Sequence, residues 1–192
     1  QVTVLILGGL LFFLAGADIK QIIGLLILAV FMAWLIVQIS DTGHDRVVNF
    51  LAGLKDPTNA SYHVQRSFVA IIKGGLLGRG LGQADTKLTT LPFAPTDSIF
   101  AVVVEELGLL GAAVLIGLYG VLIWRGLVIA QRAPDMLGTL LASGMTFWIG
   151  IEALINMSVM VGLLPFAGNA LPFVSAGGSN LVSILCAIGI IL

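Results

Sequence analysis

Five long apolar segments dominate the chain, at about residues 1–17, 22–39, 98–124, 137–163 and 173–192. Each is close to the roughly 20 residues that an α-helix needs to cross the hydrocarbon core of a bilayer. The pattern therefore predicts an all-α fold, a polytopic bundle of transmembrane helices that forms a single membrane domain over residues 1–192. Because the chain begins and ends inside apolar sequence, we expect it to be part of a longer protein.

Residues 40–97 form the one sizeable polar region, with six basic and five acidic residues. Within it, "SYHVQRSFVAIIKGGLLG" holds an apolar run that is too short to span a bilayer, which predicts a short interfacial or re-entrant helix. Basic residues in short connections favour the cytoplasmic side. Lys20 lies in one such connection and Arg125 and Arg132 in another, which places the large 40–97 loop on the extracytoplasmic side.

The composition agrees with a membrane protein, because 58% of the residues are hydrophobic, 10% are charged, and the mean hydropathy is +1.10. Ordinary soluble domains are about a quarter charged. The formal net charge is -1, whereas nucleic-acid binding needs a basic surface, so DNA and RNA are excluded as partners. The single cysteine, Cys186, lies in an apolar run, and no disulfide framework is expected.

Acidic residues within the predicted helices need a reason, because a charge at the centre of a membrane helix costs about 2.5–3.5 kcal/mol. Glu105 and Glu106 are adjacent, and at about 100° per residue Glu105 shares more of a helix face with Asp97 than Glu106 does. One interpretation is that both glutamates are protonated or paired with other helices and hold the bundle together. The other is that they take part directly in chemistry or gating.

Asp97 differs from these glutamates because two prolines and Thr96 place it at the entrance of a helix, where water reaches it. One interpretation makes Thr96 or Asp97 the helix N-cap, and the other gives Asp97 a chemical role. Glu152 and Asn156 are four residues apart and share a helix face. They are expected either to hydrogen-bond to a neighbouring helix or to line a polar cavity.

Glycines and basic residues cluster in "KGGLLGRGLGQ", residues 73–83. The segment lacks the spacing of a P-loop, so both flexible turns and a phosphate contact stay open. The candidate phosphate contacts are Lys73, Arg79 and Lys87, acting as point charges.

Two serines flank the glycines that open the last apolar segment. Ser175 and Ser179 are candidates for substrate binding, with the helix N-terminus as an anion site and tight backbone packing as the alternative. His44 and His63 have no metal-ligand spacing, so a metal role is not expected for either.

Three motifs in one order make the chain resemble the SEDS family, the FtsW and RodA group of bacterial cell-wall polymerases. The central motif is "LPFAPTDSIFAVVVEELGLLG", with "YHVQRSFVAIIKGGLLGRGLGQADTKL" before it and "N…GLLPFAGNALPFVSAGGSN", which begins at Asn156, after it. The wording of the central motif favours the FtsW side of the family. The resemblance implies that the chain is the later half of a ten-helix fold.

The resemblance also implies an activity, the joining of lipid II units into glycan strands at the outer face of the bacterial cytoplasmic membrane, with release of undecaprenyl diphosphate. A class B penicillin-binding protein would be the partner that crosslinks the strands. Asp97 matches the family's essential aspartate and would be the general base of an inverting glycosyltransferase. A divalent cation, or one of the basic candidates above, would stabilise the diphosphate, and Glu105 and Glu106 would shape a polar cavity beneath Asp97.

The chain departs from the family at some positions, which bears on substrate details. Pro95 stands where a histidine is usual and Ser98 where an aromatic residue is usual, while the aspartate is kept. Two rival functions stay open. A flippase or other transporter of lipid-linked precursors would depend on the three membrane glutamates more than on Asp97. A non-catalytic membrane scaffold of the cell-wall machinery would depend on none of these acids.

Overall fold

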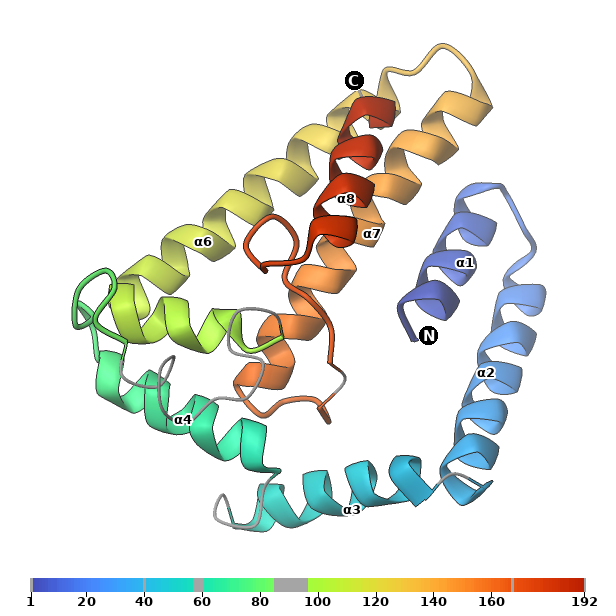
Figure 1. The fold of residues 1–192 in the computed structure, drawn as a ribbon. Helices are drawn as coiled ribbons and strands as arrows, with labels where there is room; N and C mark the ends of the chain where they lie inside the picture. The colour runs from blue at the N-terminus through green and yellow to red at the C-terminus, as the bar shows by residue number, and fades with distance from the viewer. Residues whose placement is uncertain (1, 40, 57–60, 85–96, 167, 192) are drawn as a thin grey trace.

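The computed structural model describes residues 2–39, 41–56, 61–84, 97–166 and 168–191, and every regular element in these ranges is an α-helix (Figure 1). In chain order the helices are α1 (Val2–Leu14), α2 (Ile19–Ile39), α3 (Asp41–Lys55), α4 (Tyr62–Gly74), α6 (Ile99–Gln131), α7 (Met136–Met160) and α8 (Gly178–Ile191). The all-α fold is confirmed.

The lengths of the helices bear on the membrane spans. Among the described residues, α2, α6 and α7 are long and apolar enough to cross a membrane, while α1 and α8 are shorter apolar helices. The expected segment 98–124 corresponds to a helix that continues to Gln131 and contains a break. Which of the five expected segments cross the bilayer stays a prediction.

The polar region 40–97 holds two helices in its described part, where the sequence predicted one. The expected short helix is α4, and α3 is additional. Helix α3 carries Val47, Phe50 and Leu54 at a spacing of three and four residues, which is the period of an amphipathic helix. Charged residues flank these apolar positions, with Asp45 and Arg46 before them and Lys55 and Asp56 after them, so the composition of the region masks the period. Both helices lie across one end of the molecule (Figure 1).

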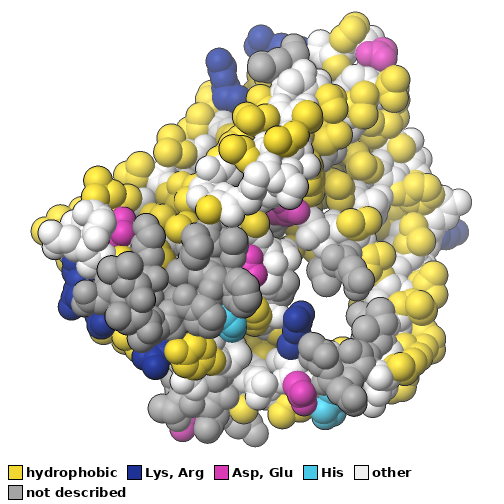
Figure 2. Space-filling model, viewed as in Figure 1, with side chains coloured by type: hydrophobic (Ala, Val, Ile, Leu, Met, Phe, Trp, Pro, Cys, Tyr) yellow, Lys and Arg dark blue, Asp and Glu magenta, His cyan; other side chains and the backbone are white. Residues whose placement is uncertain are grey.

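The surface reflects this arrangement (Figure 2). Hydrophobic side chains cover much of the visible face along the long helices, as expected for a surface that faces lipid. Charged side chains lie mainly towards the end formed by α3 and α4 and towards the connection between α6 and α7. Apolar side chains along the long helices, with most of the charged ones towards the two ends, are consistent with a multi-pass membrane protein.

The main core lies where α4, α6, α7 and the loop between α7 and α8 meet. Its buried members are mostly small or aliphatic: Ala70, Phe100, Ala101, Val104, Ala112, Tyr119, Ala153, Ile155, Val159, Met160 and Leu171. Small side chains let helices approach closely, which is how helices associate in membranes. The start of α6 is therefore surrounded by protein.

Helix α6 breaks at Gly108, which has φ 72° and ψ -173°. Figure 1 shows the turns before the break at a clear angle to the rest of α6. The roughly 23 residues after the break rise about 35 Å, which is enough to cross a hydrocarbon core of about 30 Å. Glu105 and Glu106 precede this part of the helix, so their position does not require charges at the middle of the bilayer.

The loop after α4 replaces the hydrogen bonds that the break removes. The main-chain N–H groups of Arg79 and Gly80 donate to the carbonyl oxygens of Glu105 and Glu106, each at 3.0 Å. In the other direction, two N–H groups just after Gly108 donate to the loop: Leu109 to Gly75 at 2.9 Å and Leu110 to Leu76 at 3.2 Å. Four main-chain groups at the broken turn are thus satisfied from outside the helix.

Close main-chain approach explains the glycines of the 73–83 segment. A β-carbon on Gly74 would lie 2.9 Å from Cα of Glu105, and one on Gly78 would lie 2.6 Å from the nitrogen of Gly108. Gly78 also has a φ of 78°, which side chains disfavour. Docking against α6 therefore accounts for this motif without a bound phosphate.

Candidate active site around Asp97

Asp97 lies half-buried in the turn before α6. The helix begins at Ile99, so the N-cap residue is Ser98, which is fully buried and makes no side-chain capping hydrogen bond. Asp97 thus lies one residue before the capping position, against the interpretation that made it the N-cap. Thr96, the other capping candidate, lies outside the described residues.

Asn156 connects this turn to α7. Its side chain is 2% exposed, and its Nδ2 donates to the carbonyl oxygen of Asp97 at 2.9 Å and to the carbonyl oxygen of Asn169. Because both acceptors are main-chain carbonyls, they fix which side of the amide carries the NH₂ group. One side chain thereby joins α7, the turn that carries Asp97, and the loop that follows α7.

That loop passes beside the carboxyl group of Asp97. A β-carbon built on Gly168 would lie 3.3 Å from Oδ2 of Asp97, and Gly168 has a φ of 60°. A side chain at this position would crowd the carboxyl group and strain the backbone. The glycine leaves room next to Asp97.

His63, at the start of α4, lies on another side of the same loop. Its ring stacks on Phe166 with centroids 4.3 Å apart and 6° between the planes, and Ser67 Oγ donates to its carbonyl oxygen at 2.9 Å. Burial lowers the pKa of His63 below its ordinary 6.5, and the charge of Asp97 opposes part of that effect. Sequence reasoning missed this placement, because no spacing relates residue 63 to residues 97 and 166.

The two glutamates of the central motif lie towards the break in α6. Glu105 is 0% exposed and Glu106 is half-buried. Glu105 follows the first residue of the helix by six positions, a rise of about 9 Å. The polar cavity that they were expected to shape beneath Asp97 stays a prediction.

Two of the three basic candidates are at the same end of the broken segment. Lys73 is in the last turn of α4, Arg79 is in the following loop, and both are exposed. The main-chain N–H of Arg79 donates to the carbonyl oxygen of Glu105. Lys87 lies outside the described residues, so the choice among the three as a diphosphate contact stays open.

The remaining candidates make local contacts. Glu152 is half-buried and accepts a hydrogen bond from the Trp148 side chain one turn earlier in α7. Ser175 Oγ accepts the N–H of Leu171 at 2.7 Å, which shapes the turn before α8. Ser179 is exposed in the first turn of α8. The substrate role of these three residues stays a prediction.

A metal site is not formed by the part of the chain that the structure describes. Within it, no group of three or more His, Cys, Asp and Glu side chains is placed to hold a metal ion. The role of a divalent cation stays a prediction.

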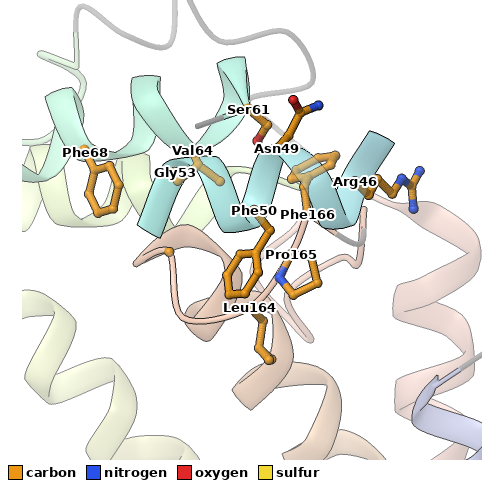
Figure 3. Close-up of a pocket in the computed structure, with 11 residues that line it drawn as sticks. Arg46, Asn49, Phe50, Gly53, Ser61, Val64, Phe68, Leu164, Pro165 and Phe166 are labelled. Carbon is orange, nitrogen blue, oxygen red and sulfur yellow. The ribbon is translucent and has the colours of Figure 1, made fainter. Parts of the chain in front are cut away.

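A cavity of about 100 Å³ lies beyond the His63–Phe166 stack, between α3, α4 and the loop after α7 (Figure 3). Its lining is mostly apolar: Arg46, Asn49, Phe50, Gly53, Ser61, Val64, Phe68, Gly162, Leu164, Pro165 and Phe166. Phe166 borders this cavity and stacks on His63, whereas Gly168 of the same loop borders Asp97. Two nearby residues of one loop thus border the cavity and the aspartate.

Comparison with known proteins shows which family the chain resembles. The family model FTSW_RODA_SPOVE, described as "Cell cycle protein", matches residues 1–192. The chain is 40% identical over 191 residues to "Probable peptidoglycan glycosyltransferase FtsW" of Geobacter metallireducens, covering 98% of this chain and 51% of that protein. The protein of the same name from Halothiobacillus neapolitanus is 46% identical over 151 residues, covering 77% of this chain and 36% of that protein.

A solved structure gives the same relation. The structure titled "Structural coordination of polymerization and crosslinking by a peptidoglycan synthase complex" contains a chain that matches with a TM-score of 0.75 at 27% identity, over 99% of this chain and 53% of that chain. The present chain therefore spans about half the length of its relatives. By sequence and by structure, the chain belongs to the FtsW, RodA and SpoVE family of multi-pass membrane proteins.

Proposed function

We propose that the protein is a peptidoglycan glycosyltransferase that polymerises lipid II, with Asp97 as its general base. The observation that carries the proposal is the placement of Asp97, half-buried at the start of a membrane helix, beside Gly168 and held through Asn156. The relatives of 40% and 46% identity carry the name of this activity. Because the chain spans 51% of the first relative, the rest of the protein would complete the substrate site.

The proposed chemistry needs one base and one leaving group. Asp97 accepts the proton of the acceptor sugar's 4-hydroxyl group, and the hydroxyl oxygen bonds to the anomeric carbon of the donor sugar. The bond from that carbon to undecaprenyl diphosphate breaks, and its electron pair leaves with the diphosphate. A single displacement inverts the anomeric carbon, so no covalent glycosyl-enzyme is required.

Other groups would serve this step without transferring the proton. The leaving diphosphate needs positive charge or N–H donors, which Lys73, Arg79 or Lys87 would supply. The apolar faces of the long helices would hold the polyprenyl tail. The partner would be a class B penicillin-binding protein, since the structural relative is a complex that couples polymerisation with crosslinking.

The reaction would take place at the extracytoplasmic face of the bacterial cytoplasmic membrane. Asp97 precedes α6 and Asp135 follows it, so the two aspartates lie at opposite ends of a 33-residue helix. The basic residues Arg125 and Arg132 lie near the second end, which is the cytoplasmic end by the charge rule. The Asp97 end would then face outwards.

The test uses the full-length protein, purified with its penicillin-binding partner and supplied with labelled lipid II. Asp97→Asn should abolish glycan polymer while the variant keeps its fold and its partner. Asp135→Asn is the matched control, because it removes an exposed carboxylate at the other end of α6 and should leave polymer length unchanged. Equal polymer from the wild type and Asp97→Asn would refute the role of Asp97.

A wild-type complex that makes no polymer would refute the proposed activity itself. The same preparation would then be tested for movement of lipid II across vesicles, with Glu105→Gln, Glu106→Gln and Glu152→Gln. Transport that depends on these glutamates would identify a transporter. If the preparation showed neither polymer nor transport, the scaffold function would be the remaining candidate.

A further inference from the structure

We propose that Asn156 is a positioning residue for the reaction, which holds the Asp97 carboxyl group in place through the main chain. This inference rests on the proposed function, since it concerns the geometry of the proposed base. Asn156 would touch neither substrate nor leaving group. Its action would be to fix two main-chain segments whose separation decides where the carboxyl group of Asp97 stands.

The two hydrogen bonds of Asn156 reach the residue that carries the carboxyl group and the loop that borders it. One goes to the carbonyl oxygen of Asp97 itself, at 2.9 Å. The other goes to the carbonyl oxygen of Asn169, the neighbour of Gly168, which lies beside Oδ2 of Asp97. One amide therefore holds both the main chain of Asp97 and the loop that borders its carboxyl group.

The amide is well suited to this role because it is rigidly placed. Asn156 is 2% exposed on α7, and buried main-chain carbonyls must be hydrogen-bonded. Both of its N–H bonds are used, whereas its Oδ1 has no hydrogen-bond partner among the described residues. The side chain therefore acts here as a donor of two hydrogen bonds, and the donors are what a test must remove.

Loss of the donors should disturb the position of the base more than the binding of the lipid. A misplacement of about 1 Å can lower the rate of a reaction roughly 100-fold. Lipid-linked substrates are held mainly by their long apolar tail and their diphosphate, neither of which would contact Asn156. The expected signature is a fall in kcat with little change in KM.

The test is made on the full-length protein with its partner. Asn156→Asp keeps the shape of the side chain and removes both donors, and Asn156→Leu removes them without adding a charge. Ser158→Ala, two residues further along α7, is the control, because Ser158 is half-buried and its hydroxyl group makes no hydrogen bond to another described residue. For each variant, kcat, KM, lipid II binding and the thermal midpoint are measured, with rates given per lipid-binding molecule.

We expect both variants at 156 to lower kcat by about 100-fold, with KM and lipid II binding within about twofold of the wild type, and Ser158→Ala to match the wild type. A wild-type kcat in Asn156→Leu would overturn the inference. A parallel loss of lipid binding, or failure of both variants to fold, would also overturn it, since the amide would then support the fold as a whole. A wild-type complex without polymer would instead refute the proposed function, and the inference with it.

Discussion

Replacing Gly108 by alanine tests the broken helix most directly. At this residue α6 changes direction, and the loop after α4 supplies the missing hydrogen bonds. We expect Gly108→Ala to destabilise the protein strongly. We expect the same change at Gly117, further along the same helix, to be tolerated, because no heavy atom lies within 4 Å of the new β-carbon in this chain.

The magnitude follows from the geometry of residue 108. Its φ of 72° with ψ -173° is a conformation that is essentially restricted to glycine, and other residues there cost about 1–3 kcal/mol. A β-carbon would also overlap the main chain of Leu76 and Gly78, and overpacking costs typically about 1–3 kcal/mol. If the loop moved away instead, the four hydrogen bonds at the break would be lost, at about 0.5–1.5 kcal/mol each. Either route predicts a loss of about 2–6 kcal/mol.

The assay is thermal unfolding of the full-length protein in detergent, followed by tryptophan fluorescence and by the fraction that stays monodisperse. Gly117→Ala should raise the midpoint slightly, because alanine favours a helix over glycine by about 0.5–1 kcal/mol. Gly78→Ala should resemble Gly108→Ala, since its β-carbon would approach the nitrogen of Gly108. The double variant should lose less stability than the two single losses predict, because one displacement of the loop relieves both overlaps.

Two results would refute this reasoning. Equal midpoints for Gly108→Ala and Gly117→Ala would show that the break does not depend on glycine. Additive losses at Gly78 and Gly108 would show that the two residues do not meet in the folded protein.

Three further predictions concern other contacts. Tyr119→Phe removes a buried hydroxyl group that donates to the carbonyl oxygen of Pro172, and should lower the stability by about 1–3 kcal/mol in thermal unfolding. Gly126→Ala places a β-carbon 2.7 Å from Cγ2 of Thr146 and should lower the stability by about 1–3 kcal/mol. A second change, Thr146→Ala, should restore the stability. The pKa of His63 is lower in the folded protein, so as the pH falls the unfolded chain binds a proton on His63 before the folded protein does. The stability should therefore fall as the pH drops below about 6.5. Thermal melts between about pH 8 and pH 5 should show a smaller fall for His63→Gln than for the wild type.

The helices and the candidate base could be predicted from local sequence. Apolar segments of about 20 residues fit only a helical bundle in lipid, because every backbone polar group must be satisfied within the segment. The position of Asp97 at the entrance of a helix also follows from local sequence, whereas its role as a base is what the resemblance to the SEDS family implies. The apolar segments and the acid at a helix entrance can each be seen within one short stretch of the sequence.

The break in α6 could not be predicted in this way. Glycines are frequent in membrane helices, and "EELGLLGAA" contains two of them with nothing local to distinguish Gly108 from Gly111. The break is stable because the loop 75–80, far earlier in the chain, offers four hydrogen bonds there. Likewise, the shared face of Glu152 and Asn156 was visible in the sequence, but the acceptors of Asn156 are separated from it by 59 and 13 residues.

The three family motifs meet on one short piece of helix, the first turns of α6 before Gly108. The glycine loop of the first motif binds the far end of this piece, at the carbonyl groups of Glu105 and Glu106. Asn156, which opens the third motif, binds the near end at the carbonyl group of Asp97 and also binds Asn169 of the same motif. Because a helix of about nine residues is stiff, a shift at one end must move the other. The glycines at the break therefore bear on the position of the aspartate, although they lie well away from it along the helix.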